Sequence, residues 1–238
     1  MPAQIEENDP RIEVEKVTYK GAAGEISAYL VKPKGVAKAP GVVIIHENKG
    51  LQPHIMDVAR RAAVAGFVAL APDFLSPVGG TPDDVDEAPE RIKLLDAAQT
   101  TENGLAAVAY LRGSANCTGK VGTIGFCWGG AVSNQIAVKD PKLDAGVVFY
   151  GRSPADEDVP KIKARMMLNY GSLDKNINPG VPPYEAALKA AGVNYEMHMY
   201  EGAGHAFHND DGGDRHHPEN SKLAWGRTMD FLKGALSA

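Results

Sequence analysis

Apolar and polar positions along the chain repeat with two spacings, which predict strands and helices in alternation. Residues 12–19 and 25–31 alternate apolar and polar side chains on either side of a Gly21–Gly24 turn, as in an antiparallel hairpin. Short apolar runs without helical spacing follow, and these are typical of strands buried on both faces. The runs are 42–46, 67–71, 121–126, 145–150, 164–170 and 195–200.

Helical spacing separates these runs and completes the predicted fold. The segments with this spacing are 55–65, 91–111, 131–138, 181–191 and 218–236. Alternation of strands and helices after a hairpin predicts an α/β fold: a mostly parallel, twisted sheet of about eight strands with helices on both faces. We expect a flexible N-terminal tail over 1–11 and one domain over 12–238. The Pro-, Gly- and Asp-rich stretch Asp73–Pro89 is predicted to be a loop that lines a site.

Composition narrows the classes of partner. Among 238 residues, 44% are hydrophobic and the net charge is -5, so no electrostatic feature favours nucleic acid or an anionic membrane. No apolar run reaches the ~18 residues of a membrane span, and no signal-peptide pattern is present. We therefore expect a cytoplasmic protein; a leader removed from the chain would instead make it periplasmic or secreted. Cys117 and Cys127 flank one predicted strand, too far apart for a disulfide.

The stretch Val121–Gly130, VGTIGFCWGG, contains a candidate nucleophile. A buried strand turns through Gly125 and Gly129 into a helix, which is the G-x-nucleophile-x-G elbow with Cys127 in place of the usual serine. The positive end of the following helix would favour a thiolate there. The alternative is a buried structural cysteine, since free cysteine often behaves as a small core residue.

Two further groups follow later strands in the order that such enzymes use. Asp174 comes after the run 164–170, and His205 comes after 195–200. Because the carboxyl ends of parallel strands meet at one edge of the sheet, both can reach Cys127. A thiol needs a base, and the base needs a group that orients it. Taken singly, Asp174 could be a turn residue and His205 a loop histidine, but their joint placement favours a triad.

The histidines near the end of the chain raise the question of a metal. His205, His208, His216 and His217 stand among aspartates without a regular ligand spacing, so we expect no metal and no cofactor. The simpler interpretation is a polar surface loop near the mouth of the site. Cys117 is expected to be exposed and to play no part in the chemistry.

These residues carry a resemblance to the dienelactone hydrolase family, the carboxymethylenebutenolidases. It runs from about Ile12 to Leu236, and its most specific parts are VGTIGFCWGG, the His46–Glu47 pair, the Asp174 turn and the GAGHAF segment around His205. The resemblance implies an α/β-hydrolase fold and hydrolysis of a lactone or small carboxylic ester. We expect a small-molecule substrate as partner, and a monomer or small homo-oligomer.

The resemblance also implies roles for individual residues. Cys127 attacks the carbonyl, His205 is the base and Asp174 orients it. Glu47 interacts with the resting thiol and moves when substrate binds. The backbone N–H groups of Trp128 and Asn48 would form the oxyanion hole, as the elbow geometry also predicts.

Substrate contacts are less well determined by the resemblance. Tyr150 could line the acyl pocket or belong to the core. The family holds a substrate carboxylate with arginines, one of them four residues after the catalytic histidine, where this chain has Asn209. Arg91 lies near the place of another, and Arg152 and Lys49 are alternative cations. Asn209 therefore favours a neutral ester or lactone over an anionic one.

Two other classes of function stay open. The chain could be a catalytically silent α/β-hydrolase fold that binds a ligand, in which case iodoacetamide would not label Cys127 near neutral pH. It could also be a thiol redox protein using Cys127 and Cys117, although their spacing is not C-x-x-C. A hydrolase would keep its activity in Cys117→Ala, whereas a dithiol enzyme would lose it.

Overall fold

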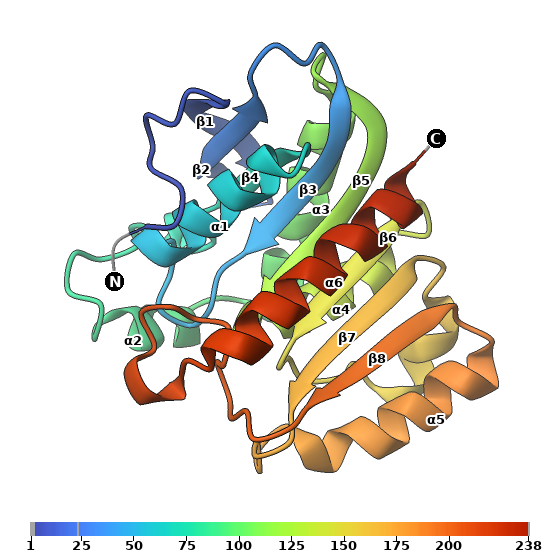
Figure 1. Ribbon diagram of the computed structural model, residues 1–238. Helices are drawn as coiled ribbons and strands as arrows, with labels where there is room; N and C mark the ends of the chain where they lie inside the picture. The colour runs from blue at the N-terminus through green and yellow to red at the C-terminus, as the bar shows by residue number, and fades with distance from the viewer. Residues whose placement is uncertain (1–2, 23, 238) are drawn as a thin grey trace.

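The structure is a computed structural model that describes residues 3–22 and 24–237. Its strands form one eight-stranded sheet in the order β1-β2-β4-β3-β5-β6-β7-β8 (Figure 1). The hairpin consists of β1 (Ile12–Gly21) and β2 (Gly24–Pro33), which pair antiparallel from Gly21 opposite Gly24 to Ile12 opposite Pro33. On its other side β2 pairs antiparallel with β4 (Val68–Pro72), so β1 is at the edge of the sheet and β2 is not.

From β4 onward the neighbouring strands pair in parallel, as the sequence predicts. Their carboxyl ends therefore meet along one edge, which is where the candidate residues were expected. The remaining strands are β3 (Ala39–Ile45), β5 (Cys117–Phe126), β6 (Ala145–Phe149), β7 (Arg165–Gly171) and β8 (Tyr195–Tyr200). The predicted mostly parallel sheet with an N-terminal hairpin is confirmed.

Helices cover both faces of this sheet (Figure 1). In β3, Val42 and Ile44 belong to the apolar cluster under α1 and α6, whereas Val43 and Ile45 belong to the cluster under α3, α4 and α5. Successive side chains of a strand point to opposite faces, so a strand buried on both faces has a continuous apolar run. The helices are α1 (Pro53–Val64), α3 (Ala97–Gly113), α4 (Trp128–Lys139), α5 (Val181–Ala191) and α6 (Pro218–Leu236).

The long helix predicted over 91–111 is wrong, because two helices occupy this region. A short α2 (Ala88–Lys93) ends before α3 begins. Asp96 has an extended backbone with ψ of 129° and accepts a hydrogen bond from the Gln99 N–H at 2.8 Å, which caps α3. Leu94, which extends the apolar pattern, is 71% exposed. The capping aspartate therefore decides the boundary, and the apolar spacing does not.

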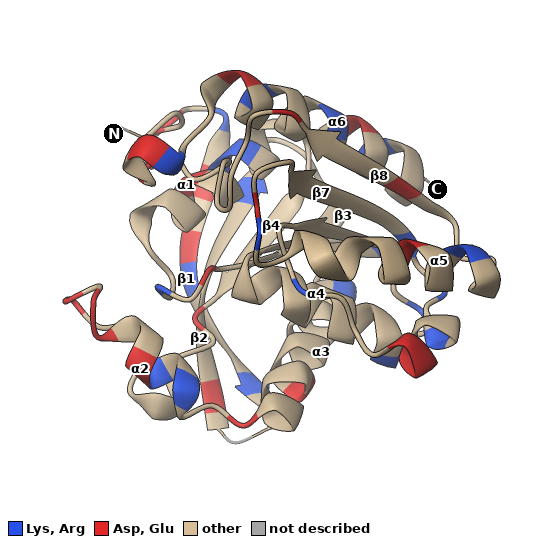
Figure 2. Cartoon of the chain, turned by 90° about the horizontal axis from the view of Figure 1, so that it is seen from below, with Lys and Arg blue, Asp and Glu red and all other residues tan. Residues whose placement is uncertain are grey.

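Three further features bear on the expectations from sequence. Cys117 is buried at the start of β5, so the expectation that it is exposed is wrong. It lies at the opposite end of the strand from Cys127, about 30 Å away at ~3.3 Å per residue. Positive and negative residues are interspersed over the elements in Figure 2. Among the helices of the described ranges, none combines the length and apolar character that crossing a bilayer requires.

Candidate active site

The turn between β5 and α4 holds Cys127 in a backbone conformation that few residues adopt, with φ of 54° and ψ of -114°. The glycines on either side are required by close packing. A Cβ atom on Gly125 would lie 2.0 Å from the carbonyl oxygen of Gly129, and one on Gly129 would lie 2.4 Å from that of His46. The strained turn presents the thiol at the carboxyl edge of the sheet, as a nucleophile elbow does.

The three side chains expected to meet there do so. His205 Nε2 lies 3.1 Å from the sulfur of Cys127, and His205 Nδ1 lies 2.6 Å from Asp174 Oδ2. The Asp174 side chain is 1% exposed and that of His205 is 30% exposed. The other carboxylate oxygen of Asp174 accepts the N–H groups of Asn176 and Ile177, each at 3.2 Å. Asp174 is therefore held by its own turn and can orient the imidazole.

The Cys127 thiol is protonated in this environment. Burial and then the nearby charge of Glu47 raise its pKa to about 11, while the backbone N–H of Trp128 lowers it. Burial therefore outweighs the stabilisation that the N-terminus of α4 was expected to supply. The thiol has His205 as its acceptor, so its proton can leave when the sulfur attacks.

Glu47 is buried beside the thiol and is held by two neutral donors. Its Oε1 accepts the Tyr150 hydroxyl at 3.1 Å, and its Oε2 accepts the Asn209 amide at 2.6 Å. Burial raises the pKa of Glu47, and the hydrogen bonds from Asn209 and Tyr150 partly oppose this. In this structure the carboxylate is therefore bound to these two residues, and the hydrogen bond of Cys127 goes to His205.

His46 orients the loop that carries Glu47. Its Nε2 accepts the backbone N–H of Phe74 at 3.2 Å, so its Nδ1 carries the proton and donates to the Glu47 carbonyl at 2.6 Å. Burial lowers the pKa of His46, which keeps the ring neutral. The ring also stacks on Trp128, with 5.3 Å between ring centroids. His46 therefore holds the start of the Glu47 loop by hydrogen bonds at both ring nitrogens.

The remaining expected residues lie at different depths. Asn48 is exposed, three residues beyond the end of β3, and Trp128 is half-buried at the start of α4. Tyr150 is fully buried, and its ring centroid lies 5.1 Å from that of His205. Tyr150 therefore supports Glu47 and His205 from the protein interior.

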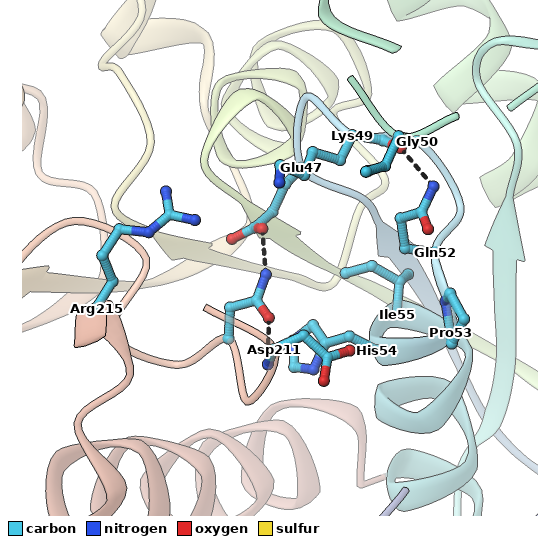
Figure 3. Close-up of a pocket in the computed structure, with 11 residues that line it drawn as sticks. Glu47, Lys49, Gly50, Gln52, Pro53, His54, Ile55, Asp211 and Arg215 are labelled. Carbon is cyan, nitrogen blue, oxygen red and sulfur yellow. Dashed lines mark hydrogen bonds between the residues drawn. The ribbon is translucent and has the colours of Figure 1, made fainter. Parts of the chain in front are cut away.

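A cavity of about 230 Å³ lies next to Glu47 (Figure 3). This is small for a ligand pocket, which commonly encloses ~300–1,000 Å³. Glu47 and Asn209 are on its wall, but Cys127 and His205 are not. Val85 lines it as well, which places the predicted Asp73–Pro89 loop at the site.

Charges of both signs surround this cavity. Lys49 and Arg215 line it, as does Asp211. Figure 3 shows Arg215 extending toward Glu47, and the positive charge of Arg215 lowers the pKa of both Glu47 and Cys127, against the larger effect of burial. Arg91 does not line the cavity, because its guanidinium donates to the Gly80 carbonyl at 3.0 Å.

Sequence reasoning missed Arg215. The cations expected from sequence were Arg91, Arg152 and Lys49, and the segment that carries Arg215 was expected to be a loop of histidines and aspartates. The available signal was position, because Arg215 lies ten residues after His205 in the same connection to α6.

The expected polar surface loop is also partly wrong. His208 is fully buried, with its ring centroid 5.1 Å from that of Phe126 and 5.6 Å from that of Trp225. Asp210 is buried against Arg61. Long-range partners therefore allow polar residues of this segment to enter the core. Within residues 3–22 and 24–237, no three His, Cys, Asp or Glu side chains form a group that could hold a metal ion.

Comparisons with known proteins show which family the chain resembles. The model of the dienelactone hydrolase family matches residues 26–236. A protein of Methylorubrum extorquens, provisionally named a carboxymethylenebutenolidase, is 32% identical over 88% of this chain and 77% of its own length. A similarly named protein of Saccharolobus solfataricus is 30% identical over 92% of this chain and 97% of its own length.

A solved structure extends the comparison to the fold. The crystal structure of a provisionally named dienelactone hydrolase from Klebsiella pneumoniae has a TM-score of 0.83 and 26% sequence identity, and the match covers 92% of this chain and 97% of that one. The family resemblance first seen in the elbow and the strand ends is confirmed. This chain has the α/β-hydrolase fold and belongs to the dienelactone hydrolase family.

Proposed function

We propose that the chain hydrolyses a lactone or small carboxylic ester, with Cys127 as nucleophile, His205 as base and Asp174 as the group that orients the base. Family membership supplies the reaction class, a hydrolase acting on ester bonds. The observation that carries the assignment of residues is the relay of 3.1 Å and 2.6 Å that joins the thiol to His205 and His205 to Asp174.

The relay supports a two-step reaction. As the sulfur of Cys127 attacks the carbonyl carbon, its proton passes to His205 Nε2, and Asp174 stabilises the resulting imidazolium. The imidazolium protonates the leaving oxygen and an acyl-enzyme thioester remains. His205 then takes a proton from water, which attacks the thioester and releases the acid and the thiol. No metal or cofactor is needed for these transfers.

The elbow also supplies charge stabilisation for this reaction. The tetrahedral intermediate carries a negative oxygen, and preorganised N–H donors stabilise such an oxygen strongly. The Trp128 N–H already lies close enough to the sulfur to lower the pKa of Cys127. We assign the Trp128 N–H and the Asn48 N–H as the two donors.

The test is hydrolysis of a small p-nitrophenyl ester by matched cysteine variants. Cys127→Ala should abolish turnover with its circular dichroism spectrum unchanged, while Cys117→Ala should retain turnover. Unchanged turnover in Cys127→Ala would sink the proposal. Loss in Cys117→Ala with the fold intact would contradict a mechanism that uses Cys127 alone. A silent binding protein would show no turnover in the parent chain.

Two residues have opposite effects on whether the site prefers a neutral or a negatively charged substrate. Asn209, in place of the family's arginine, favours neutral substrates, whereas Arg215 brings a cation to the cavity. A carboxylated lactone and its methyl ester, compared in the parent chain and in Arg215→Gln, decide between them. If Asn209 dominates, the methyl ester is hydrolysed faster and Arg215→Gln leaves the preference unchanged. If Arg215 holds the carboxylate, the variant loses activity on the carboxylated lactone alone.

A further inference from the structure

A buried ion network lies beyond the cavity, on the side of α1. Asp57 and Arg61 both belong to α1, and Asp210 belongs to the segment after β8; they are 2%, 7% and 8% exposed. The Arg61 guanidinium donates to the carboxylates of both Asp57 and Asp210. One cation thus joins a helix to a segment 149 residues away along the chain. Leaving any one of these three buried charges without its partner would lower the stability of the fold.

The beginning of the chain completes this network. The backbone N–H groups of Gln4 and Ile5 donate to the Asp57 carboxylate at 3.1 and 2.8 Å. The Gln4 side-chain amide donates to Asp210 Oδ2 at 3.0 Å. Arg60 holds the same segment from α1, because its Nε donates to the Ile5 carbonyl at 2.5 Å. Gln4 therefore contacts both carboxylates that Arg61 bridges.

Asp210 links the network to Glu47, because its neighbour in the chain, Asn209, contacts Glu47. The preceding residue, Asn209, donates its amide to Glu47 at 2.6 Å. That amide is oriented by its own turn, because the Asn209 side-chain oxygen accepts the Asp211 N–H at 2.9 Å and its backbone carbonyl accepts the Gly212 N–H at 2.9 Å. A shift of Asp210 would therefore move the amide that holds Glu47.

Arg61 is the residue that balances the negative charge of Asp210 at every pH. The other titratable groups facing Asp210 are His54 at 4.0 Å and His216 at 3.3 Å. Burial lowers the pKa of His54 to about 4, so this ring is neutral at neutral pH. Arginine stays charged at every pH of interest. Asp210 is thus held by the fixed charge of Arg61, with Gln4 as a second donor to the same oxygen and His216 facing the other oxygen.

We propose that Arg61 and Gln4 are positioning residues that act through Asp210 and Asn209 to hold Glu47 beside Cys127. This inference rests on the proposed function, in which Cys127 is the reacting thiol, because the nearby charge of Glu47 raises the pKa of that thiol. A displacement of about 1 Å in a group that supports a site can cost on the order of 100-fold in rate. The network therefore connects Gln4 and Ile5 to the proposed chemistry at the carboxyl edge of the sheet.

The experiment is a double-mutant cycle between Arg61→Gln and Asn209→Ala, measured as kcat and KM for a p-nitrophenyl ester. If Arg61 acts through Asn209, Arg61→Gln lowers kcat about tenfold with a smaller change in KM, and adds less than about twofold to the loss in Asn209→Ala. Arg61→Lys keeps the charge and should restore most of the activity. Multiplied losses in the double variant would overturn the proposal.

Controls separate positioning from loss of stability. Arg112→Gln breaks the ion pair with Asp140, 3.2 Å long and remote from the site, so it should lower the melting temperature and leave kcat unchanged. If Arg61→Gln does not fold, Gln4→Ala removes a single donor from Asp210 and should show the same dependence on Asn209. Independent effects of Gln4→Ala and Asn209→Ala would also overturn the proposal.

A second measurement does not depend on the substrate. The rate of alkylation of Cys127 by iodoacetamide, followed by mass spectrometry across pH, reports the environment of the thiol. Arg61→Gln should change this profile in the parent chain and not in Asn209→Ala. If Cys127→Ala keeps full esterase activity, the proposed function fails, yet the alkylation cycle still decides whether the network acts on Glu47. An unchanged profile in Arg61→Gln would refute the positioning role.

Discussion

Replacing Glu47 with glutamine should stabilise the protein at neutral pH, although it changes a candidate functional group. Burial raises the pKa of Glu47, so the folded chain binds this proton more tightly than the unfolded chain does. The free energy of unfolding therefore falls as pH rises from the pKa of the unfolded chain through that of the folded chain. Above the pKa of the folded chain, the folded protein bears the full cost of the buried charge.

The contacts of Glu47 set the size of the effect. Removing an ionised carboxylate from water costs several kcal/mol, and each hydrogen bond from Asn209 and Tyr150 returns about 1.5–3 kcal/mol. The raised pKa means that the cost is the larger of the two. A glutamine keeps an oxygen for the Asn209 amide and can donate to the Tyr150 oxygen. We expect a gain of about 1 kcal/mol, or ~2–4 °C in melting temperature.

The assay is thermal unfolding of the parent chain and Glu47→Gln across pH. The difference in melting temperature should increase as pH rises above the pKa of the unfolded chain and should disappear below about pH 4, where the carboxyl is protonated in both folded and unfolded states. Removing the negative charge should also lower the pKa of Cys127 and move its alkylation profile to lower pH. A variant less stable than the parent at neutral pH, or a difference independent of pH, would refute the reasoning.

Three further predictions concern single contacts. Asp174→Asn should lower kcat by roughly 10³–10⁴-fold with little change in KM, because His205 loses the carboxylate that orients it; a loss under tenfold in steady-state kinetics would contradict this. Gly129→Ala places a Cβ atom 2.4 Å from the His46 carbonyl and should destabilise the fold by about 1–3 kcal/mol or more, so an unchanged melting temperature would count against it. Asp96→Ala removes the cap of α3 and should cost about 1 kcal/mol with activity intact; a kinetic defect without a change in melting temperature would be inconsistent with a purely structural cap.

The strands and their mostly parallel arrangement could be predicted from sequence because each strand carries a local pattern, whereas the order of the strands across the sheet could not. Alternation identifies the hairpin, and continuous apolar runs identify strands buried on both faces. The turn at Cys127 was predictable for a similar reason, since Gly125 and Gly129 stand where no larger residue fits. Asp174 and His205 follow from the rule that groups at the carboxyl ends of parallel strands converge.

What could not be predicted depends on partners far away in the chain. The burial of Asp210 requires Arg61, which lies 149 residues earlier in the chain. The sequence around Asp210 contains no pattern that predicts this ion pair. The same holds for the hydrogen bonds that direct Glu47 toward Tyr150 and Asn209. The break before α3 has a different origin: Leu94 continues the helical spacing, so only the capping geometry of Asp96 reveals the boundary.

The contacts of Gln4 and Ile5 have a practical consequence for anyone who prepares this protein. An affinity tag fused to the N-terminus would be attached close to the carboxylates of Asp57 and Asp210, and the two neighbours of Asp210 in the chain, Asn209 and Asp211, line the cavity. The two ends of the chain lie on opposite sides of the molecule in Figure 1. Kinetic constants measured with the tag after α6 are therefore the ones to compare between variants, and purification handles at the other end are best cleaved first.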